Sequence, residues 1–354
     1  MQTLALSPEL CGKIVDFLSN RHRDLLSLSL TCKTFQREAE IRLYSCLNLT
    51  HPETTLSACD SLLSNERLAL HVRIFVYNEI MDNDSPRPGT QFWSQIQRVL
   101  IQMVNLETLI LSDLSYSNSW IFGTPNIQFR LREVRLRFAW DAYVMQFFES
   151  QTNLRSIHFH DSLDREDVIP QISPQALPNL QLFDGSMIIG FQLLSFSPLT
   201  HLQLIVDCEH EAVLEILSHF ATLRKTLRGL SLLDIPEEIT HRALDIISRG
   251  IPEIRHLGLF PYPVNARHEF HEVLMRMHSL QSIELDVGRW NPPPYAKPSQ
   301  RVLISELCLF CPSLKVVMLW MGHTRARWAW VNNQWHSFID PRQLPQHSNV
   351  WCSV

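Results

Sequence analysis

Three pairs of residues have types and spacings that would suit a metal or a ligand. Cys308 and Cys311 have the C-x-x-C spacing of zinc and redox sites, but no second cysteine or histidine pair follows at the distance that a zinc site needs. His268 and His271 are three residues apart, near enough on a helix to share a metal, although a zincin needs H-E-x-x-H. The sequence also contains no nucleophile elbow, Walker loop or dinucleotide fingerprint. We therefore expect a protein that is not an enzyme and has no metal or cofactor, in which Cys308 and Cys311 are small core residues.

The third pair, His158 and His160, lies on either side of Phe159. Alternate side chains of a strand point to opposite faces, so the two imidazoles share the face opposite Phe159. If Phe159 points into a core, the histidines lie on the exposed face. There they either bind a ligand or form part of an ordinary surface, and the sequence leaves both alternatives open.

The composition indicates a folded protein without a strong charge. The chain has 354 residues, 45% of them hydrophobic, which excludes an intrinsically disordered protein. With 36 Asp+Glu against 31 Lys+Arg, the net charge of -5 gives no electrostatic basis for bulk binding to nucleic acid or to anionic membranes. Only 10 glycines are present, which makes a glycine-dependent phosphate site less favoured.

Targeting features are lacking in the sequence. The first ten residues have no basic start and no unbroken apolar run, and no stretch approaches the ~20 apolar residues that a membrane span needs. The eight cysteines are far apart and lie mostly within apolar patterns, as expected of reduced thiols in a core. We expect an intracellular protein, cytoplasmic or nuclear or both, with no membrane partner.

The first 45 residues predict three short amphipathic helices. Ser7 is placed to cap the first helix and Pro8 suits its first turn, after which the apolar residues follow at helical spacing: Leu10, Ile14, Phe17 and Leu18. Asp24 is a candidate cap for a second helix, and Phe35, Ala39 and Leu43 share one side of a third. Three such helices cannot build a large core, so we expect a neighbour or a partner to cover their leucines.

At these residues the sequence resembles the F-box family. The resemblance covers about 40 residues and is carried by the run Leu6-Ser7-Pro8-Glu9-Leu10, then Ile14, Phe17-Leu18, Asp24-Leu25-Leu26-Ser27-Leu28, Cys32-Lys33-Thr34-Phe35, Ala39 and Leu43-Tyr44. Two positions depart from the pattern. Ser7 stands where the family usually has proline, and Gly12 lies inside the first helix, where it costs up to ~1 kcal/mol relative to alanine.

The resemblance implies docking onto the Skp-type adaptor of a cullin-RING ubiquitin ligase. It also implies which side chains face that adaptor or support the face that does: Leu6, Pro8, Leu10, Ile14, Leu25, Leu28, Cys32 and Phe35. An alternative is that the three helices only close the end of a repeat array, because solenoids need end caps.

The rest of the chain is repetitive. The pattern L-x-x-L-x-L recurs from Leu106 to Leu319, for example as Leu199-Leu202-Leu204, with starts 19 to 34 residues apart. The last two apolar residues of each copy are two apart and so share one strand face, and helical spacing fills most intervals. Residues 184–198 show no clear helix. The pattern predicts an α/β solenoid with a parallel sheet on its concave side and helices outside.

The array resembles irregular leucine-rich-repeat proteins of the kind often found behind an F-box. It lacks the regular Asn or Cys that closes each repeat in consensus families. The predicted organisation has four parts: residues 1–48 as the F-box-like helical domain, 49–90 as a connecting segment with a first strand, 91–321 as the solenoid, and 322–354 as a C-terminal cap and tail.

The cap is predicted as a β-hairpin. Residues 327–331 and 334–338 read as two strands joined by Asn332-Asn333, and their tryptophans can cover the core of the last repeat. A nucleic-acid surface using Arg325 and Arg327 has little support in an acidic chain.

Two further segments have loop character. Asn291-Pro292-Pro293-Pro294-Tyr295 is either a stiff loop or, through Pro292 to Tyr295, a ligand for a WW domain. Residues 82–90 are most simply an exposed connector.

Together these features favour a non-catalytic substrate receptor of an SCF-type ubiquitin ligase. Its F-box-like helices would bind the adaptor, through it the cullin and RING subunits, and its repeats would hold an unknown protein substrate. Outward-facing repeat positions supply geometric candidates for substrate contact, namely Arg135, His158, His160, Gln203, Ser231 and Glu284, with Ile110, Gly258 and Met318 at equivalent positions. The alternative function is a leucine-rich-repeat interaction scaffold without a role in a ubiquitin ligase.

Overall fold

The structure is a computed structural model, and it describes residues 6–18, 21–78, 87–161, 169–338 and 350–352. Contacts between residues divide the chain into two compact units, Met1–Gln171 and Ile172–Val354. The division differs from the boundaries expected at residues 48, 90 and 321, which stay predictions.

The first unit begins with three helices, α1 (Pro8–Phe17), α2 (His22–Ser29) and α3 (Lys33–Ser45). As expected, the Ser7 side chain caps α1 by accepting a hydrogen bond from the Leu10 backbone N–H, at 3.4 Å. The expectation that Asp24 caps α2 is wrong, because α2 begins at His22 and places Asp24 in the first turn. There the carboxylate faces the positive end of the helix dipole. Both α1 and α2 pack on α3.

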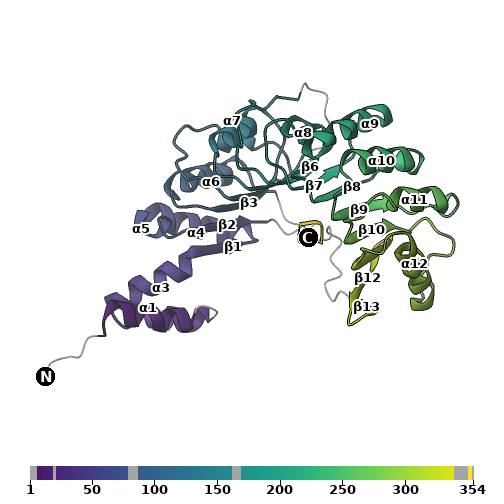
Figure 1. The fold of residues 1–354 in the computed structure, drawn as a ribbon. Helices are drawn as coiled ribbons and strands as arrows, with labels where there is room; N and C mark the ends of the chain where they lie inside the picture. The colour runs from purple at the N-terminus through teal and green to yellow at the C-terminus, as the bar shows by residue number, and fades with distance from the viewer. Residues whose placement is uncertain (1–5, 19–20, 79–86, 162–168, 339–349, 353–354) are drawn as a thin grey trace. The chain divides into compact units, whose positions relative to one another are not determined.

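The remainder of the first unit alternates strands with helices, and its strands β1 to β5 are parallel and lie side by side in chain order. Figure 1 shows them as a sheet with helices along it. The elements are β1 (Cys46–Leu49), α4 (Pro52–Ser64), α5 (Glu66–Ala69), β2 (Ile74–Tyr77), α6 (Thr90–Gln102), β3 (Thr108–Ser112), the 3₁₀ turn η1 (Ser119–Phe122), β4 (Glu133–Arg137), α7 (Ala142–Ser150) and β5 (Ser156–His160).

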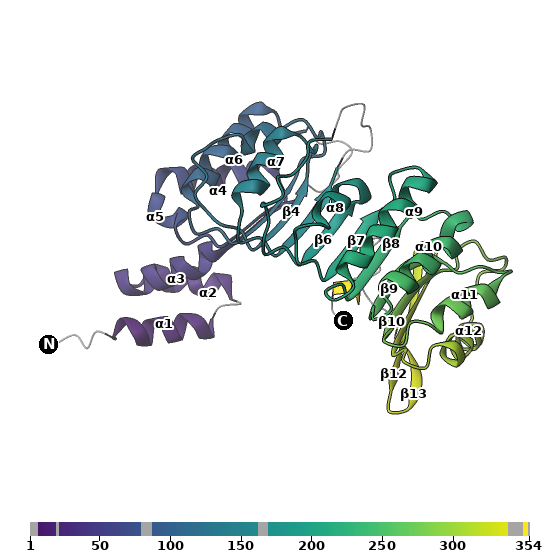
Figure 2. The same cartoon turned by 45° about the horizontal axis from the view of Figure 1, so that its top comes forward.

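The second unit continues the same alternation with parallel strands β6 to β11, followed by two antiparallel strands. Helices cover one face of these strands, as the turned view in Figure 2 shows. The elements are β6 (Leu182–Ser186), α8 (Met187–Leu193), β7 (His201–Ile205), α9 (His210–His219), η2 (Phe220–Leu223), β8 (Gly229–Leu233), α10 (Glu237–Gly250), β9 (His256–Pro261), α11 (Arg267–Leu274), β10 (Ser282–Asp286), α12 (Lys297–Phe310), β11 (Val316–Met321), β12 (Thr324–Val331), β13 (Gln334–Phe338) and η3 (Val350–Cys352).

The mixed α/β class and the strand–helix repeat are confirmed, with two corrections. Residues 184–198, expected to have no clear helix, contain α8, a two-turn helix whose start is capped by the Ser186 hydroxyl. Residues 49–90, expected to be a connector with one strand, also contain the helices α4 and α5. Residues 82–86 of the predicted connector lie outside the described residues.

The leucine pattern works as expected because each strand buries alternate residues. In β3, for example, Leu109 and Leu111 are at most 1% exposed, while Ile110 between them is half-exposed. Neighbouring repeats are also joined at the start of each strand. The backbone N–H groups of Glu107 and Arg132 donate to the carbonyls of Arg73 and Glu107, each at 2.8 Å.

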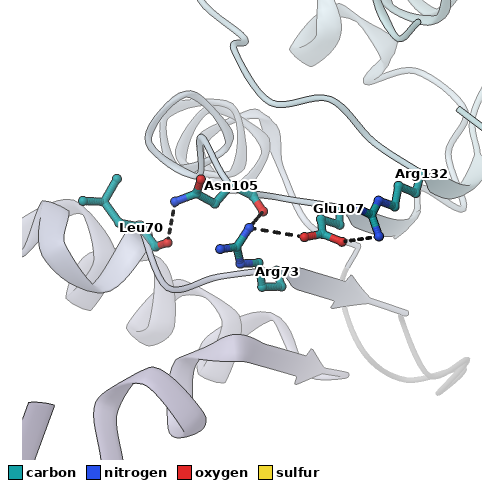
Figure 3. A network of polar contacts seen from close by, with 5 residues as sticks. All are labelled: Leu70, Arg73, Asn105, Glu107 and Arg132. Carbon is teal, nitrogen blue, oxygen red and sulfur yellow. Dashed lines mark hydrogen bonds and ion pairs between the residues drawn. The ribbon is translucent and has the colours of Figure 1, made fainter. Parts of the chain in front are cut away.

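Side chains add a second connection at this edge of the first unit (Figure 3). The Arg73 guanidinium pairs with Glu107 at 3.2 Å, and the other carboxylate oxygen of Glu107 pairs with Arg132 at 3.3 Å. The Asn105 amide donates to the Leu70 carbonyl at 2.8 Å. Arg73 and Arg132 are more than half exposed, so these ion pairs contribute at most ~1 kcal/mol each, and the backbone bonds carry most of the connection.

Strand β9 departs from the predicted pattern through a β-bulge. The sequence places Leu257 and Leu259 in the core, but Leu259 has a left-handed φ of 63° and is half-exposed, while Phe260 is fully buried opposite Leu285. The bulge therefore gives the core position of Leu259 to Phe260.

The C-terminal hairpin expected at residues 327–338 is present as β12 and β13. Asn332 and Asn333 have φ of 51° and 61°, the left-handed conformation that a two-residue type I′ turn needs. Strand β12 pairs with β11, and Trp328 is buried with its indole N–H donating to the Gln300 side chain at 3.0 Å.

Because of the bulge, we expect truncation of Phe260 to destabilise the protein more than truncation of Leu259, the reverse of what the leucine pattern predicts. Phe260→Ala is expected to cost about 3–5 kcal/mol of unfolding free energy because it empties a core site. Leu259→Ala is expected to cost about 1 kcal/mol or less. Urea unfolding followed by circular dichroism measures both, and a larger loss for Leu259→Ala than for Phe260→Ala would contradict the observed register.

Candidate interaction surfaces

The three N-terminal helices bury a small core of their own. Cys11 and Val15 of α1, Leu25 of α2 and Ala39 of α3 are at most 1% exposed. Asp16 of α1 and Arg42 of α3 form an ion pair across the same contact, with the Arg42 Nε 2.9 Å from the carboxylate. The stripe of α1 that faces the other helices is therefore Cys11 and Val15. Each of them follows by one residue a member of the predicted apolar stripe, Leu10 or Ile14.

The stripe recognised in the sequence faces outward instead. Leu10, Ile14 and Phe17 lie at i, i+4 and i+7 of α1 and are 49%, 38% and 94% exposed. Leu26 and Leu30, four residues apart, are 54% and 88% exposed. Single exposed leucines are common on protein surfaces, but apolar residues repeated at helical spacing are typical of an interaction face.

The side chains predicted for the adaptor face divide into three groups. Leu6, Pro8, Leu10, Ile14 and Cys32 are exposed, and Leu28 and Phe35 are half-buried. Leu25 is buried and acts only as support for the other helices. The predicted set did not include Phe17 of α1 or Leu26 and Leu30 of α2, whose exposure depends on which side of each helix packs on α3.

The helix set is joined to the repeats through α3. Its end leads directly into β1, and Glu40 of α3 pairs with Arg67 of α5. The departure at Gly12 has a local consequence, because a β-carbon there would lie 3.3 Å from the Glu38 carboxylate. Glu38 is half-buried on α3, so Gly12 allows α1 and α3 a close approach.

The sheet face of the first unit is accessible. Register places Ile110, Arg135 and His158 side by side on β3, β4 and β5, and His160 lies two residues further along β5. Arg135 is exposed and pairs with Glu133 at 2.9 Å, while His158 and His160 are half-buried and lie on the strand face opposite the buried Phe159. The structure thus brings together the three candidates that the sequence placed in this unit.

The corresponding face of the second unit is not accessible, which corrects the expectation for its candidates. Gln203, Ser231, Glu284 and Met318 are only 1–2% exposed. Their polar groups have partners instead of solvent: the Gln203 amide donates to Asp184 at 3.1 Å, and Glu284 accepts from the Trp320 indole at 2.8 Å. Gly258, the fifth position, leaves room for Ser231, whose Oγ would be 2.1 Å from a β-carbon there.

A C-terminal segment lies against this face. The residues Val350–Cys352 contact β7, β8 and β9, and Trp351 is 2% exposed with its ring centroid 6.4 Å from that of His201. A β-carbon on Gly229 would lie 2.5 Å from the Trp351 carbonyl oxygen, so this close approach requires glycine. The sequence gives no sign of this contact, because Trp351 follows Gly229 by 122 residues and His201 by 150 residues.

His256 forms the centre of the buried polar group. Its Nε2 is 3.2 Å from the Ser231 hydroxyl and its Nδ1 is 2.7 Å from the Ser282 hydroxyl. Burial, with a smaller effect of His201, lowers the pKa of His256 to about 3, and this outweighs the attraction of the Glu284 carboxylate 3.8 Å away. A serine beside a histidine is a nucleophile pattern, but His256 and both serines are at most 1% exposed and cannot meet a substrate.

In each of the other two chemistry-bearing pairs only one residue is buried, Cys311 in the first and His271 in the second. Burial raises the pKa of Cys308 to about 11 and also raises that of Cys311, which disfavours the thiolate that metal binding needs. His268 is exposed, whereas His271 is buried against the Tyr262 hydroxyl at 2.8 Å, so the two do not converge. Within the described ranges, no three His, Cys, Asp or Glu side chains are placed to hold a metal ion.

Two sequence expectations need correction, one about the cysteines and one about the proline segment. All eight cysteines are free thiols, but Cys32 and Cys46 are exposed and are not core residues. In the proline segment Tyr295 is 61% exposed, while Pro294 is buried and its carbonyl accepts a hydrogen bond from Gln300 at 2.9 Å. A WW domain would therefore meet only part of the motif, and this contact stays a prediction.

Comparison with known proteins adds no relationship. No protein-family model matches the chain, and no curated protein matches its sequence. Among the helices that the structure describes, none combines the length and apolar character that spanning a bilayer requires.

The depressed pKa of His256 predicts a pH-dependent stability. Between about pH 3 and pH 6.5 the unfolded chain binds a proton at this residue and the folded chain does not, so the unfolding free energy falls as pH falls, by up to ~1.4 kcal/mol per pH unit. His256→Asn keeps an amide that can bond to the serines and does not titrate. Denaturant titrations from pH 7 to pH 5 are expected to show a steeper loss for the native chain, and equal slopes would refute the assignment.

Proposed function

We propose that the chain is a non-catalytic substrate receptor of an SCF-type ubiquitin ligase. The observation that carries this proposal is the outward apolar stripe of α1, Leu10, Ile14 and Phe17, on a helix set that already has a separate inward stripe. A set of this size gains nothing from keeping a second stripe in water, so a partner that covers it is the simplest explanation. The F-box-like spacing of the same residues indicates a Skp-type adaptor as that partner.

The first unit's sheet face is proposed to hold the protein substrate. It offers Ile110, Arg135, His158 and His160 at accessible positions on adjacent strands, a mixture of apolar, cationic and hydrogen-bonding groups. The receptor would act by proximity, since holding a substrate next to the activated ubiquitin raises the effective concentration of its lysines. In this proposal the chain itself makes and breaks no bond.

Adaptor binding is tested by co-expression with a Skp-type adaptor and size-exclusion chromatography. The native chain is expected to form a stable one-to-one complex. Leu10→Asp is expected to weaken that complex about 100-fold or more, because it replaces an apolar contact by a carboxylate buried without a partner. Leu10 is half-exposed in the free chain, so the variant should fold.

Leu309→Asp is the matched control, since Leu309 is an exposed leucine on the outer helix α12, 78% exposed and outside the N-terminal helices. It is expected to leave the complex intact. A folded, monodisperse native chain that forms no complex would refute the proposal and leave a repeat scaffold as the function, with the helices as an end cap.

Substrate docking is tested by reversing charge on the first unit's sheet face. Arg135→Glu together with His158→Glu is expected to reduce ubiquitination of bound substrates at least tenfold while adaptor binding is unchanged, because the two carboxylates reverse the charge of the face that the substrate would contact. Proximity-dependent ubiquitin labelling, compared between this variant and the native complex, measures the effect. The same labelled proteins at the same level in both complexes would exclude this face.

A further inference from the structure

A cavity of about 360 Å³ lies in the second unit, at the carboxyl ends of β9 and β10. Four segments line it: the first turn of α10, the loop 261–266 after β9, the first turn of α11, and residues 286–290 after β10. Ligands of sheets with parallel strands commonly bind at this edge, where loops from neighbouring strands converge. None of these lining residues belongs to the outward apolar stripe of α1 or to the first unit's sheet face.

The apolar wall of the cavity is rigid. Trp290 stacks on Tyr262 with 5.6 Å between ring centroids and donates its indole N–H to the Tyr262 carbonyl at 2.7 Å. Tyr262 is held from behind by His271, and Phe270 packs edge-on against its ring. Ala266, on the loop that closes the cavity, has a left-handed φ of 46°, a strained conformation of the kind that clusters at binding sites.

The rim of the cavity is acidic. Glu237, Glu269 and Asp286 contribute three carboxylates, against one arginine, Arg289, and one histidine, His241. Arg289 already pairs with Glu237 at 3.6 Å and is 68% exposed. Arg267 stands nearby over the Trp290 ring, 5.6 Å from its centroid, and its guanidinium pairs with Glu306 at 2.8 Å. The balance of charge therefore favours a cation, and the Arg289–Glu237 pair shows that a guanidinium reaches this rim.

We propose that this cavity binds an alkyl guanidinium or alkyl ammonium group, the chemistry of an arginine or lysine side chain. The methylene stem would lie along Trp290 and the exposed Val264, with Tyr262 as support behind Trp290, and the charged head would reach Glu269 and Asp286. A volume of 360 Å³ is at the small end of ligand pockets, which suits one long side chain better than a cofactor. As a contact for a ubiquitination substrate the site rests on the proposed function, whereas the binding itself requires only this chain.

Arg289 has a particular role in this arrangement. It neutralises one rim carboxylate and so competes with an incoming cation for Glu237. Removing it should tighten binding, whereas removing a rim carboxylate should weaken binding. A variant that only disturbs the fold is expected to weaken binding, whichever residue it replaces. Tighter binding without Arg289 together with weaker binding without a rim carboxylate would therefore indicate an effect of charge.

The test uses the full-length chain without adaptor and follows the indole N–H signal of Trp290 by NMR, assigned with Trp290→Phe. The probes are acetylated and amidated Ala-Ala-Arg-Ala-Ala, its lysine counterpart and its citrulline counterpart, which has nearly the shape of arginine and no charge. The arginine and lysine peptides are expected to shift the signal saturably at concentrations up to about 10 mM, and the citrulline peptide to bind at least tenfold more weakly. Propylguanidine, which is the arginine side chain without its backbone and carries the same single charge, distinguishes a free cation from a side chain of a protein.

Four variants complete the test. Glu269→Gln and Asp286→Asn are each expected to weaken the arginine peptide about three- to tenfold, and Arg289→Ala to tighten it about two- to fivefold. Glu253→Gln is the matched control and should have no effect, because Glu253 is exposed just before β9, at the opposite edge of the strands.

Equal binding of the citrulline peptide would overturn the proposal, as would the lack of a saturable shift or unchanged affinity in both carboxylate variants. Tighter binding of the peptide than of propylguanidine would support a protein partner, and equal binding would support a free small cation. None of these outcomes depends on adaptor binding. A chain that forms no adaptor complex can still bind the peptide, so failure of the proposed function and failure of this inference are separate results.

Discussion

A single strand–helix repeat of about 25 residues cannot bury its own apolar face, and this constraint governs most of the molecule. Each repeat presents residues such as Leu109 and Leu111 to its neighbours, so both ends of an array need something different from another repeat. In the second unit the strand β11 is followed by the hairpin β12–β13 and not by another repeat: β12 pairs with β11, and Trp328 of β12 is buried. In the first unit β1 is preceded by α3, which packs on α5 and carries the other two helices.

Strand residues whose side chains point away from the helices are not subject to this constraint, and the two units differ at these positions. In the first unit Arg135 and His158 remain accessible. In the second unit Gln203, Ser231 and Glu284 are buried, and burying them without partners would cost several kcal/mol. Their hydrogen bonds to Asp184, His256 and Trp320 offset that cost. A buried polar group of this kind contributes to structure rather than recognition, so recognition in the second unit is more naturally placed at the strand ends, where charged groups remain exposed.

The features that the sequence predicted depend on residues close together in the chain, whereas those that it missed depend on contacts between distant residues. The leucine spacing, the Ser7 cap and the Asn332-Asn333 turn are local patterns, and the strands, α1 and the hairpin follow them. The bulge at Leu259 is a shift in the register between β9 and β10, and the residues Val350–Cys352 contact β8 although they are more than 110 residues away in the chain; neither feature leaves a local signal. The candidate site was half predictable: helical spacing identified the apolar residues of α1, but Leu10 and Val15 are equally apolar, and only packing against α3 decides which is covered.

The two proposed binding faces differ in chemistry in the way that lasting and exchangeable interfaces do. Stable interfaces are rich in apolar residues, whereas transient ones resemble ordinary polar surface. The α1 stripe is leucine, isoleucine and phenylalanine, and water solvates it poorly in the free chain. The first unit's sheet face carries arginine and histidine paired or flanked by polar neighbours, so it is well solvated without a partner. A receptor that keeps one adaptor and exchanges substrates would need this difference between its two faces. Dissociation of the adaptor would expose the apolar stripe to water at a cost in free energy, whereas the polar groups of the sheet face are well solvated after a substrate leaves.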